Sequence, residues 1–145
     1  MILYTDGSTD HNGSATSTGG CGVYFGDDDP RNISVAYGGP LPPTNQRCEL
    51  WAIRLALQAT TEAQDLIIYT DSKYAIGCLT LWCDAWKRNG WLNAKRQPVK
   101  NKEIIQSILE LCDQRSVQFK HVKAHAGIHG NEEADRLANQ GRNLF

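Results

Sequence analysis

The fold depends most on the segment LIIYTD, residues 66–71, which is apolar on both faces and ends in an aspartate. A short run of this kind predicts a strand in the middle of a sheet that is covered on both sides. It follows residues 46–59, where apolar side chains recur at helical spacing behind Thr44 or Asn45, either of which can cap a helix. A strand that follows such a helix predicts a parallel pair with an earlier strand.

The segments that precede this helix predict three more strands. Residues 1–5 and 20–25 are predicted to form a hairpin, and residues 33–38 a third strand. Prolines in residues 39–43 can continue neither a helix nor a central strand, so the chain must turn there.

Beyond residue 71 the pattern predicts a short helix to about residue 81, a helix at 101–112 and a strand at 117–121. A last helix starts at Asn131, and Gly141 is predicted to end it. This order predicts the α/β class, with a five-stranded mixed β-sheet flanked by α-helices in a single domain over residues 1–145.

Composition excludes several classes of protein. In 145 residues, no run reaches the ~18 apolar residues of a membrane helix, and the N-terminus lacks a signal peptide, so we expect an intracellular protein. The 5 cysteines are odd in number and never spaced as CxxC, which favours neither a disulfide framework nor a zinc site. Because the formal net charge is −1, a nucleic-acid binder would need a local patch of positive charge.

The tripeptide Tyr-Thr-Asp occurs twice, at residues 4–6 and 69–71, each time at the C-terminal end of a predicted strand. Neighbouring strands lie about 4.8 Å apart, so Asp6 and Asp71 would repel each other unless a cation lay between them. Either aspartate alone could simply open a turn. The repetition favours a shared site.

Two more acidic residues fall on faces that should turn inward. Glu49 lies in the first turns of its helix beside Ala52 and Ile53, and Asp135 shares a stripe with Ala134 and other small residues of the last helix. A surface position is the alternative for each of them. A buried carboxylate is costly without a partner, and four together are best explained by hard cations such as magnesium, which implies phosphoryl-transfer chemistry.

Four segments resemble type 1 ribonuclease H, and eukaryotic-type enzymes most of all, in order and spacing over essentially the whole chain. They are DGS at 6–8, TNQRCE at 44–49, YTDS at 69–72, and residues 125–135 with HAG and GNEEAD. The resemblance implies a ribonuclease H-like fold and endonucleolytic cleavage of the RNA strand of RNA/DNA hybrids. The implied products carry 5′-phosphate and 3′-hydroxyl ends.

The same resemblance implies roles for particular residues. Asp6, Glu49, Asp71 and Asp135 match the ligands of two Mg²⁺ ions, for which Mn²⁺ can substitute. One ion would activate the attacking water and the other would stabilise the leaving 3′ oxygen. His125 is similar to a family histidine that moves protons and assists product release.

Three histidines recur at four-residue spacing, at 121, 125 and 129, which could suggest a metal-binding helix. Gly127 and Gly130 argue against a helix there, and His121 lies in a strand pattern. We therefore do not expect a structural zinc site.

Recognition of a hybrid requires contacts to each strand. Asn12, Asn45 and Gln46 resemble the residues that touch the RNA 2′-hydroxyl, which amide side chains can bind as donor or acceptor. Asn45 as a plain helix cap is the competing interpretation.

Residues 82–102 are basic and rich in tryptophan, and they resemble the family's basic protrusion for the DNA strand. Trp82, Trp86, Lys87 and Arg88 are the predicted contacts, although Trp82 or Trp91 could instead be mainly core residues.

A pocket for a DNA phosphate is also implied by the resemblance, at Thr44 and Asn101. Pro42, however, stands where cellular eukaryotic members often have an arginine, which puts the strength of this pocket in doubt.

Two alternatives stay open. One is another metal nuclease or strand-transfer enzyme of the same architecture, such as an integrase or resolvase relative. The other is a non-catalytic or reverse-transcriptase-associated domain that binds hybrids without cutting them, against which the four intact acids argue. We expect a monomer. The sequence does not distinguish a free-standing enzyme from part of a longer protein.

Overall fold

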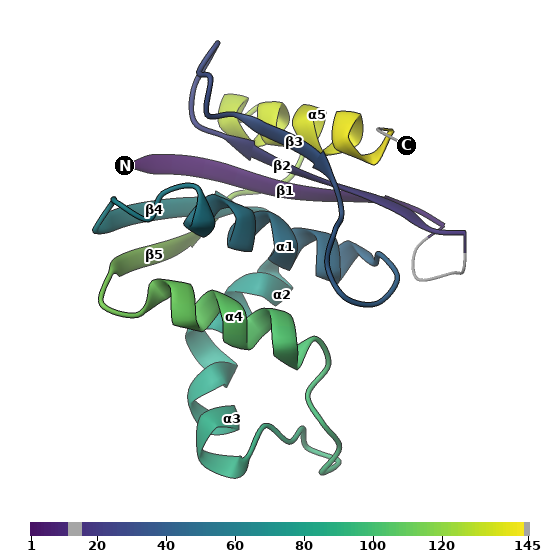
Figure 1. Ribbon diagram of the computed structural model, residues 1–145, viewed down its shortest axis with the longest axis vertical. Coiled ribbons are helices and arrows are strands. Elements are labelled where there is room, and N and C mark those ends of the chain that lie inside the picture. Colours follow the sequence, from purple (N-terminus) through teal and green to yellow (C-terminus); the bar gives the residue numbers. More distant parts are fainter. Residues whose placement is uncertain (12–15, 144–145) are drawn as a thin grey trace.

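The computed structural model describes residues 1–11 and 16–143 and contains one five-stranded mixed sheet in the order β3-β2-β1-β4-β5 (Figure 1). β1 pairs antiparallel with β2 and parallel with β4, as predicted. The predicted α/β class and the mixed sheet are therefore confirmed. The strands are β1 (Ile2–Asp10), β2 (Thr18–Tyr24), β3 (Ile33–Ala36), β4 (Asp65–Thr70) and β5 (Ser116–His121).

The parallel register places the two copies of Tyr-Thr-Asp side by side. Tyr4 is opposite Tyr69 in the ladder, and their rings stack with centroids 5.0 Å apart. β4 ends at Thr70, whereas β1 continues to Asp10. The prediction that Asp6 ends its strand is therefore wrong. Asp6 instead lies within β1, beyond the last residue pair that β1 forms with β4.

Helix α1 (Asn45–Gln58) covers one face of the sheet together with α4 (Lys102–Cys112) (Figure 1). Thr44, and not Asn45, caps α1: its hydroxyl accepts a hydrogen bond from the Arg47 amide at 3.0 Å. The apolar stripe of α1 packs onto the central strands, where it forms the main core. The fully buried side chains there include Leu3, Leu50, Ile53, Leu57 and Ile68.

Helix α5 (His129–Arg142) covers the opposite face, over β1, β2 and β3 (Figure 1). The prediction that Gly141 ends this helix is wrong, because the helix includes Gly141 and Arg142 and is followed by Asn143. Gly141 is needed for packing: a Cβ atom there would lie 2.3 Å from the carbonyl oxygen of Val35 in β3. The residue permits close approach of helix to sheet.

Residues 73–89 are helical without interruption, although the sequence predicted a helix only to about residue 81. The run comprises α2 (Lys73–Ile76), the π-helical segment η1 (Gly77–Trp82) and α3 (Cys83–Asn89), and Gly90 ends it in the left-handed conformation. Figure 1 shows α3 extending away from the sheet. This arm carries most of the predicted DNA contacts.

Within residues 1–11 and 16–143, no helix has the length and apolar character that crossing a bilayer would require. All five cysteines are free thiols, and four of them are buried.

Candidate active site

Three of the four predicted acids converge where β4 ends beside β1. One carboxylate oxygen each from Asp6, Glu49 and Asp71 lies within 4.8 Å of the others. They come from a strand, from a helix on one face of the sheet, and from the residue that follows a neighbouring strand. The sequence predicted that Asp6 and Asp71 would lie side by side and that Glu49 would face the same site, and the fold brings these three together.

The side chain of Asp6 lies on the α5 side of the sheet. Alternate residues of a strand point to the same face of the sheet, and Tyr4 and Ser8 both point toward α5. Ser8 donates a hydrogen bond to Asn139 of α5, and the Tyr4 ring packs under Gly130. Asp6 itself is only 4% exposed. A carboxylate with so little access to water requires compensation from a proton or a cation.

Glu49 reaches Asp6 because the first turns of α1 lie against β1 at Gly7. A Cβ atom on Gly7 would lie 2.5 Å from the backbone nitrogen of Glu49. The Gly7 amide also donates a 2.6 Å hydrogen bond to Oε1 of Glu49. Any larger residue at position 7 would push the helix, and with it this carboxylate, away from the site.

The other two acids are held by amide side chains of α5. Asn131 is buried and donates through Nδ2 to Oδ2 of Asp71 at 3.2 Å. Asn139 donates to Oδ2 of Asp135 at 3.4 Å. Asp135 is not one of the three acids that converge within 4.8 Å, but its charge acts on Asp6. The predicted inward stripe of α5 is confirmed, because Asn131, Ala134 and Ala138 are buried.

The electrostatics of the cluster favour a bound cation. The pKa of Asp6 is raised from 3.8 to about 8, mainly by burial and also by the carboxylates of Asp71 and Asp135, against an opposing hydrogen bond with Glu49. Burial, and next the charge of Asp6, raise the pKa of Glu49 well above its usual range. Closely spaced carboxylate oxygens that hold protons so tightly fit a hard divalent ion, which would replace those protons.

The RNase H family model matches residues 1–143. The chain belongs to the RNase H family. Ribonuclease H of Schizosaccharomyces pombe is 46% identical over 141 residues, which cover 97% of this chain and 52% of that protein. Ribonuclease H of Francisella tularensis subsp. novicida is 39% identical over 140 residues, 97% of this chain and 89% of that protein. The chain thus spans about half the length of the first relative and most of the second.

A solved structure agrees with this family assignment. The crystal structure of LC9-RNase H1, described as a type 1 RNase H with the type 2 active-site motif, superimposes with a TM-score of 0.79. Sequence identity is 25%, and the match covers 98% of this chain and 71% of that one. The predicted ribonuclease H-like fold is therefore confirmed.

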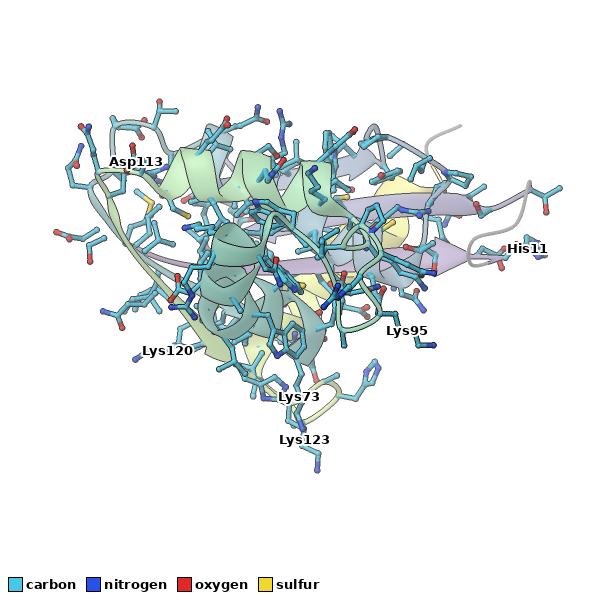
Figure 2. The ribbon with its side chains drawn as sticks, turned by 90° about the horizontal axis from the view of Figure 1, so that it is seen from below. His11, Lys73, Lys95, Asp113, Lys120 and Lys123 are labelled. Carbon is cyan, nitrogen blue, oxygen red and sulfur yellow. The ribbon has the colours of Figure 1, made fainter. Side chains whose placement is uncertain are left out.

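In this RNase H chain, His125 lies on the loop that joins β5 to α5 and is exposed. Its backbone is left-handed, with φ of 56°. Figure 2 shows Lys123, two residues earlier, pointing away from the body of the molecule. The loop starts next to Asp71, because the Val122 amide donates to the carbonyl oxygen of Thr70, and it ends at the helix that carries Asp135.

The predicted RNA contacts fall at the start of α1. Asn45 and Gln46 are exposed in its first turn, and the hydroxyl of Thr9 donates to Oδ1 of Asn45. This contact ties the amide of Asn45 to β1. Asn12, the third predicted contact, lies outside the described residues.

Thr44 and Asn101 line one hollow of about 670 Å³, as the predicted phosphate pocket requires. Sequence reasoning missed Arg47, which lines it too. Its guanidinium donates to Oδ1 of Asn101 at 3.0 Å and to the carbonyl oxygen of Pro42 at 2.7 Å. Arg47 thus supplies positive charge to the pocket whose strength Pro42 had put in doubt. It is the last residue of the TNQR segment at 44–47, so the sequence did contain the indication.

Trp82 and Trp86 of the arm and Trp91 just beyond it divide between surface and core. Trp82 is 41% exposed, whereas Trp86 and Trp91 are half-buried and pack against the main core. Lys87 and Arg88 are exposed, and Figure 2 shows Lys95 pointing outward from the loop beyond α3. Trp91 is therefore a structural residue, while Trp82 presents its ring to solvent.

A second group of potential metal ligands, Asp27, His129 and Glu133, lies elsewhere on α5 and the β2–β3 turn. His129 contacts Asp27 at 2.8 Å, the Tyr24 hydroxyl donates to the same oxygen, and Arg136 pairs with Glu133 at 2.6 Å. The Tyr24 hydroxyl, and next His129, lower the pKa of Asp27, as hydrogen bonds to a carboxylate do. These hydrogen bonds and ion pairs explain why the three side chains lie together: they hold the start of α5 against the β2–β3 turn.

Proposed function

We propose that this protein is a ribonuclease H that hydrolyses the RNA strand of RNA/DNA hybrids and leaves 5′-phosphate and 3′-hydroxyl ends. The observation that carries the proposal is the convergence of Asp6, Glu49 and Asp71 within 4.8 Å, in a chain that belongs to the RNase H family. The relatives at 46% and 39% identity are both named ribonuclease H.

The acids are proposed to hold two Mg²⁺ ions, with Mn²⁺ as a substitute. Asp6 would be the central ligand residue, because its carboxylate lies within 4.8 Å of those of Glu49 and Asp71 and also interacts with that of Asp135. The chemistry that such ions supply is activation of a water and stabilisation of the leaving 3′ oxygen. The chain itself supplies the rigid ligands, which it fixes through Gly7, Asn131 and Asn139.

His125 is proposed to carry protons to or from the reacting oxygens. Its exposed position on the loop between β5 and α5 leaves the ring accessible to bound nucleic acid and to water. Access to water suits a group that must release a proton after each turnover.

Binding of the hybrid is proposed to use two surfaces. Asn12, Asn45 and Gln46 would contact the RNA strand through its 2′-hydroxyls. Thr44, Arg47 and Asn101 would bind a DNA phosphate, and Trp82, Trp86, Lys87 and Arg88 would bind the DNA strand farther along the arm.

The direct test is cleavage of labelled substrates. The protein is incubated with RNA/DNA hybrid, double-stranded RNA or double-stranded DNA, each with Mg²⁺ or with EDTA, and end-group analysis follows. We expect cleavage of the RNA strand in the hybrid only, and only with metal. Hybrid binding without cleavage would instead identify a non-catalytic domain, and cleavage of duplex DNA another nuclease of this fold.

A further inference from the structure

A chain of hydrogen bonds connects Asp135 to the middle of the sheet. Nη1 of Arg142 donates to Oγ of Ser8 at 2.8 Å, and Oγ of Ser8 donates to Oδ1 of Asn139 at 2.6 Å. Nδ2 of Asn139 then donates to Oδ2 of Asp135 at 3.4 Å. The chain runs from the last turn of α5 through β1 and back to α5.

The direction of these bonds is fixed by chemistry. A guanidinium has donors only and an ionised carboxylate has acceptors only, so the Ser8 hydroxyl accepts from Arg142 and Asp135 accepts from Asn139. Asn139 therefore turns its NH₂ group toward Asp135 and its oxygen toward the proton of Ser8. With the amide reversed, its oxygen would face the carboxylate of Asp135, and the proton of Ser8 would lose its acceptor.

Close packing of α5 on β2 makes this chain of bonds possible. Ser8 pairs with Gly20 of β2, and a Cβ atom on Gly20 would lie 2.1 Å from the backbone nitrogen of Arg142. The last turn of α5 therefore sits directly beside Ser8, which is 8% exposed. A hydroxyl with so little access to water is costly unless it is hydrogen-bonded, and Arg142 and Asn139 provide those bonds.

We propose that Ser8 and Asn139 are positioning residues that hold the Asp135 carboxylate in the orientation it needs as a Mg²⁺ ligand. This inference rests on the proposed function. Glu49 and Asp71 each have a donor on one oxygen, from Gly7 and Asn131, and Asn139 gives Asp135 the equivalent. Ser8 acts through Asn139, because it keeps the donor side of that amide turned toward the carboxylate.

The test measures Mg²⁺ binding by calorimetry in the absence of nucleic acid. We expect Ser8→Ala and Asn139→Leu each to raise the Kd for Mg²⁺ by roughly tenfold, the lower range for partners of metal ligands. Cleavage should recover toward the parent rate at saturating Mg²⁺. Ser8→Thr keeps the hydroxyl and should restore the parent Kd, and Gln140→Ala, an exposed neighbour of Asn139, is the matched control.

The outcomes separate this inference from the function on which it rests. A parent protein that binds no Mg²⁺ would contradict both. If the parent binds Mg²⁺ and Ser8→Ala and Asn139→Leu bind it equally well, the positioning role is wrong while the proposed function stands. A lower melting temperature with an unchanged Kd would mean that the hydrogen-bond chain only stabilises the fold.

Discussion

At the level of single residues, the site combines acids that repel one another with neighbours that fix each of them in place. Asp6 is the most constrained, because it is buried and faces the charges of Asp71 and Asp135. Burial, together with these charges, raises its pKa, so the ionised form of Asp6 is disfavoured in the folded protein without a cation. Substitutions at the site should therefore affect activity and stability in opposite directions.

Asp71→Asn should abolish cleavage and leave the fold intact. The substitution removes one charged ligand while keeping the shape and the contact with Asn131. We expect hybrid cleavage to fall by more than about 10²-fold, since even outer partners of metal ligands are worth roughly 10- to 100-fold. Cleavage assays with Mg²⁺, together with circular dichroism, test this, and normal turnover by the mutant would refute the assignment.

Asp6→Asn should stabilise the metal-free protein. Because the pKa of Asp6 is about 8 in the folded chain against 3.8 ordinarily, the folded state binds the extra proton between these values. The free energy of unfolding in EDTA should therefore decrease as pH rises from about 4 to about 8, and level off above. Asparagine removes this penalty, which we expect to raise the melting temperature at pH 8 by roughly 5 °C.

Melting curves in EDTA at pH 5 and pH 8 check the sign. The rise in melting temperature caused by Asp6→Asn should be larger at pH 8 than at pH 5, where Asp6 of the parent protein is already protonated. Asp10→Asn is the control, because Asp10 is exposed on the same strand. A melting temperature at pH 8 that Asp6→Asn lowers would show that the acids do not repel one another.

His125→Ala should slow turnover without weakening metal binding. We expect the mutant to lose roughly 10²-fold in turnover or somewhat less, near the lower end of what a group that transfers protons contributes. Calorimetry should give the parent Kd for Mg²⁺, and His121→Ala, another exposed histidine, should retain the parent rate. If His125→Ala loses Mg²⁺ binding instead, the residue belongs to the metal site.

At the level of elements, we expect the arm formed by α2, η1 and α3 to serve hybrid binding and to take no part in the chemistry. Its π-helical segment ends at Trp82, whose ring folds back over Gly77, where a Cβ atom would lie 2.6 Å from the ring. Trp86 is half-buried and packs partly against the core, so the ring of Trp82 and the charges of Lys87 and Arg88 are the groups most exposed to a ligand. The arm should contribute affinity and little else.

Trp82→Ala should weaken hybrid binding and leave kcat at saturating substrate near that of the parent. Packing on one nucleotide is worth roughly 1 to 3 kcal/mol.

Lys87→Ala with Arg88→Ala should raise KM and lower the salt slope of binding by about one per phosphate contact. Leu81→Ala, an exposed neighbour, is the control for the arm itself. An unchanged KM and salt slope would mean that the arm is only structural.

At the level of the whole molecule, two helical layers deliver side chains to one point on the sheet. β4 stops at Thr70 while β1 continues, which leaves the edge of β1 open where Asp6 lies. α1 reaches this point from one face and α5 from the other (Figure 1). Binding of a ligand at this point should therefore stabilise the folded chain as a whole.

Millimolar Mg²⁺ should raise the melting temperature of the parent, because the ion binds only the assembled site. A concentration of 100 times the Kd would add about 2.7 kcal/mol to the free energy of unfolding. The shift should be larger at pH 8.5 than at pH 6, because the proton on Asp6 competes with the ion up to about pH 8. Asp6→Asn should show a smaller shift, and equal shifts in both proteins would rule out a shared cation site.

The sequence by itself determined the features that depend on local pattern. Strand and helix order, the parallel pairing of β4 with β1 and the inward stripe of α5 all follow from the spacing of apolar residues, which repeats within a few positions. The repeated Tyr-Thr-Asp indicated which two acids would lie together. Glu49 and Asp135 were recognisable because carboxylates on an inward face contradict their surroundings.

Only the tertiary structure decided how closely the layers approach and where the polar side chains find partners. Gly7 and Gly141 lie in close contact with α1 and β3, and Ser8 is hydrogen-bonded to Asn139 of α5, all of them contacts between residues that are distant in sequence. The guanidinium of Arg47 reaches Pro42, only five residues away, because of how the start of α1 packs. A glycine reads locally as a turn or a helix end, as Gly141 did. In this fold, Gly141 is needed because it has no side chain and so allows the backbone of β3 to approach closely. The sequence does not show which segment lies against it, and only the tertiary structure does.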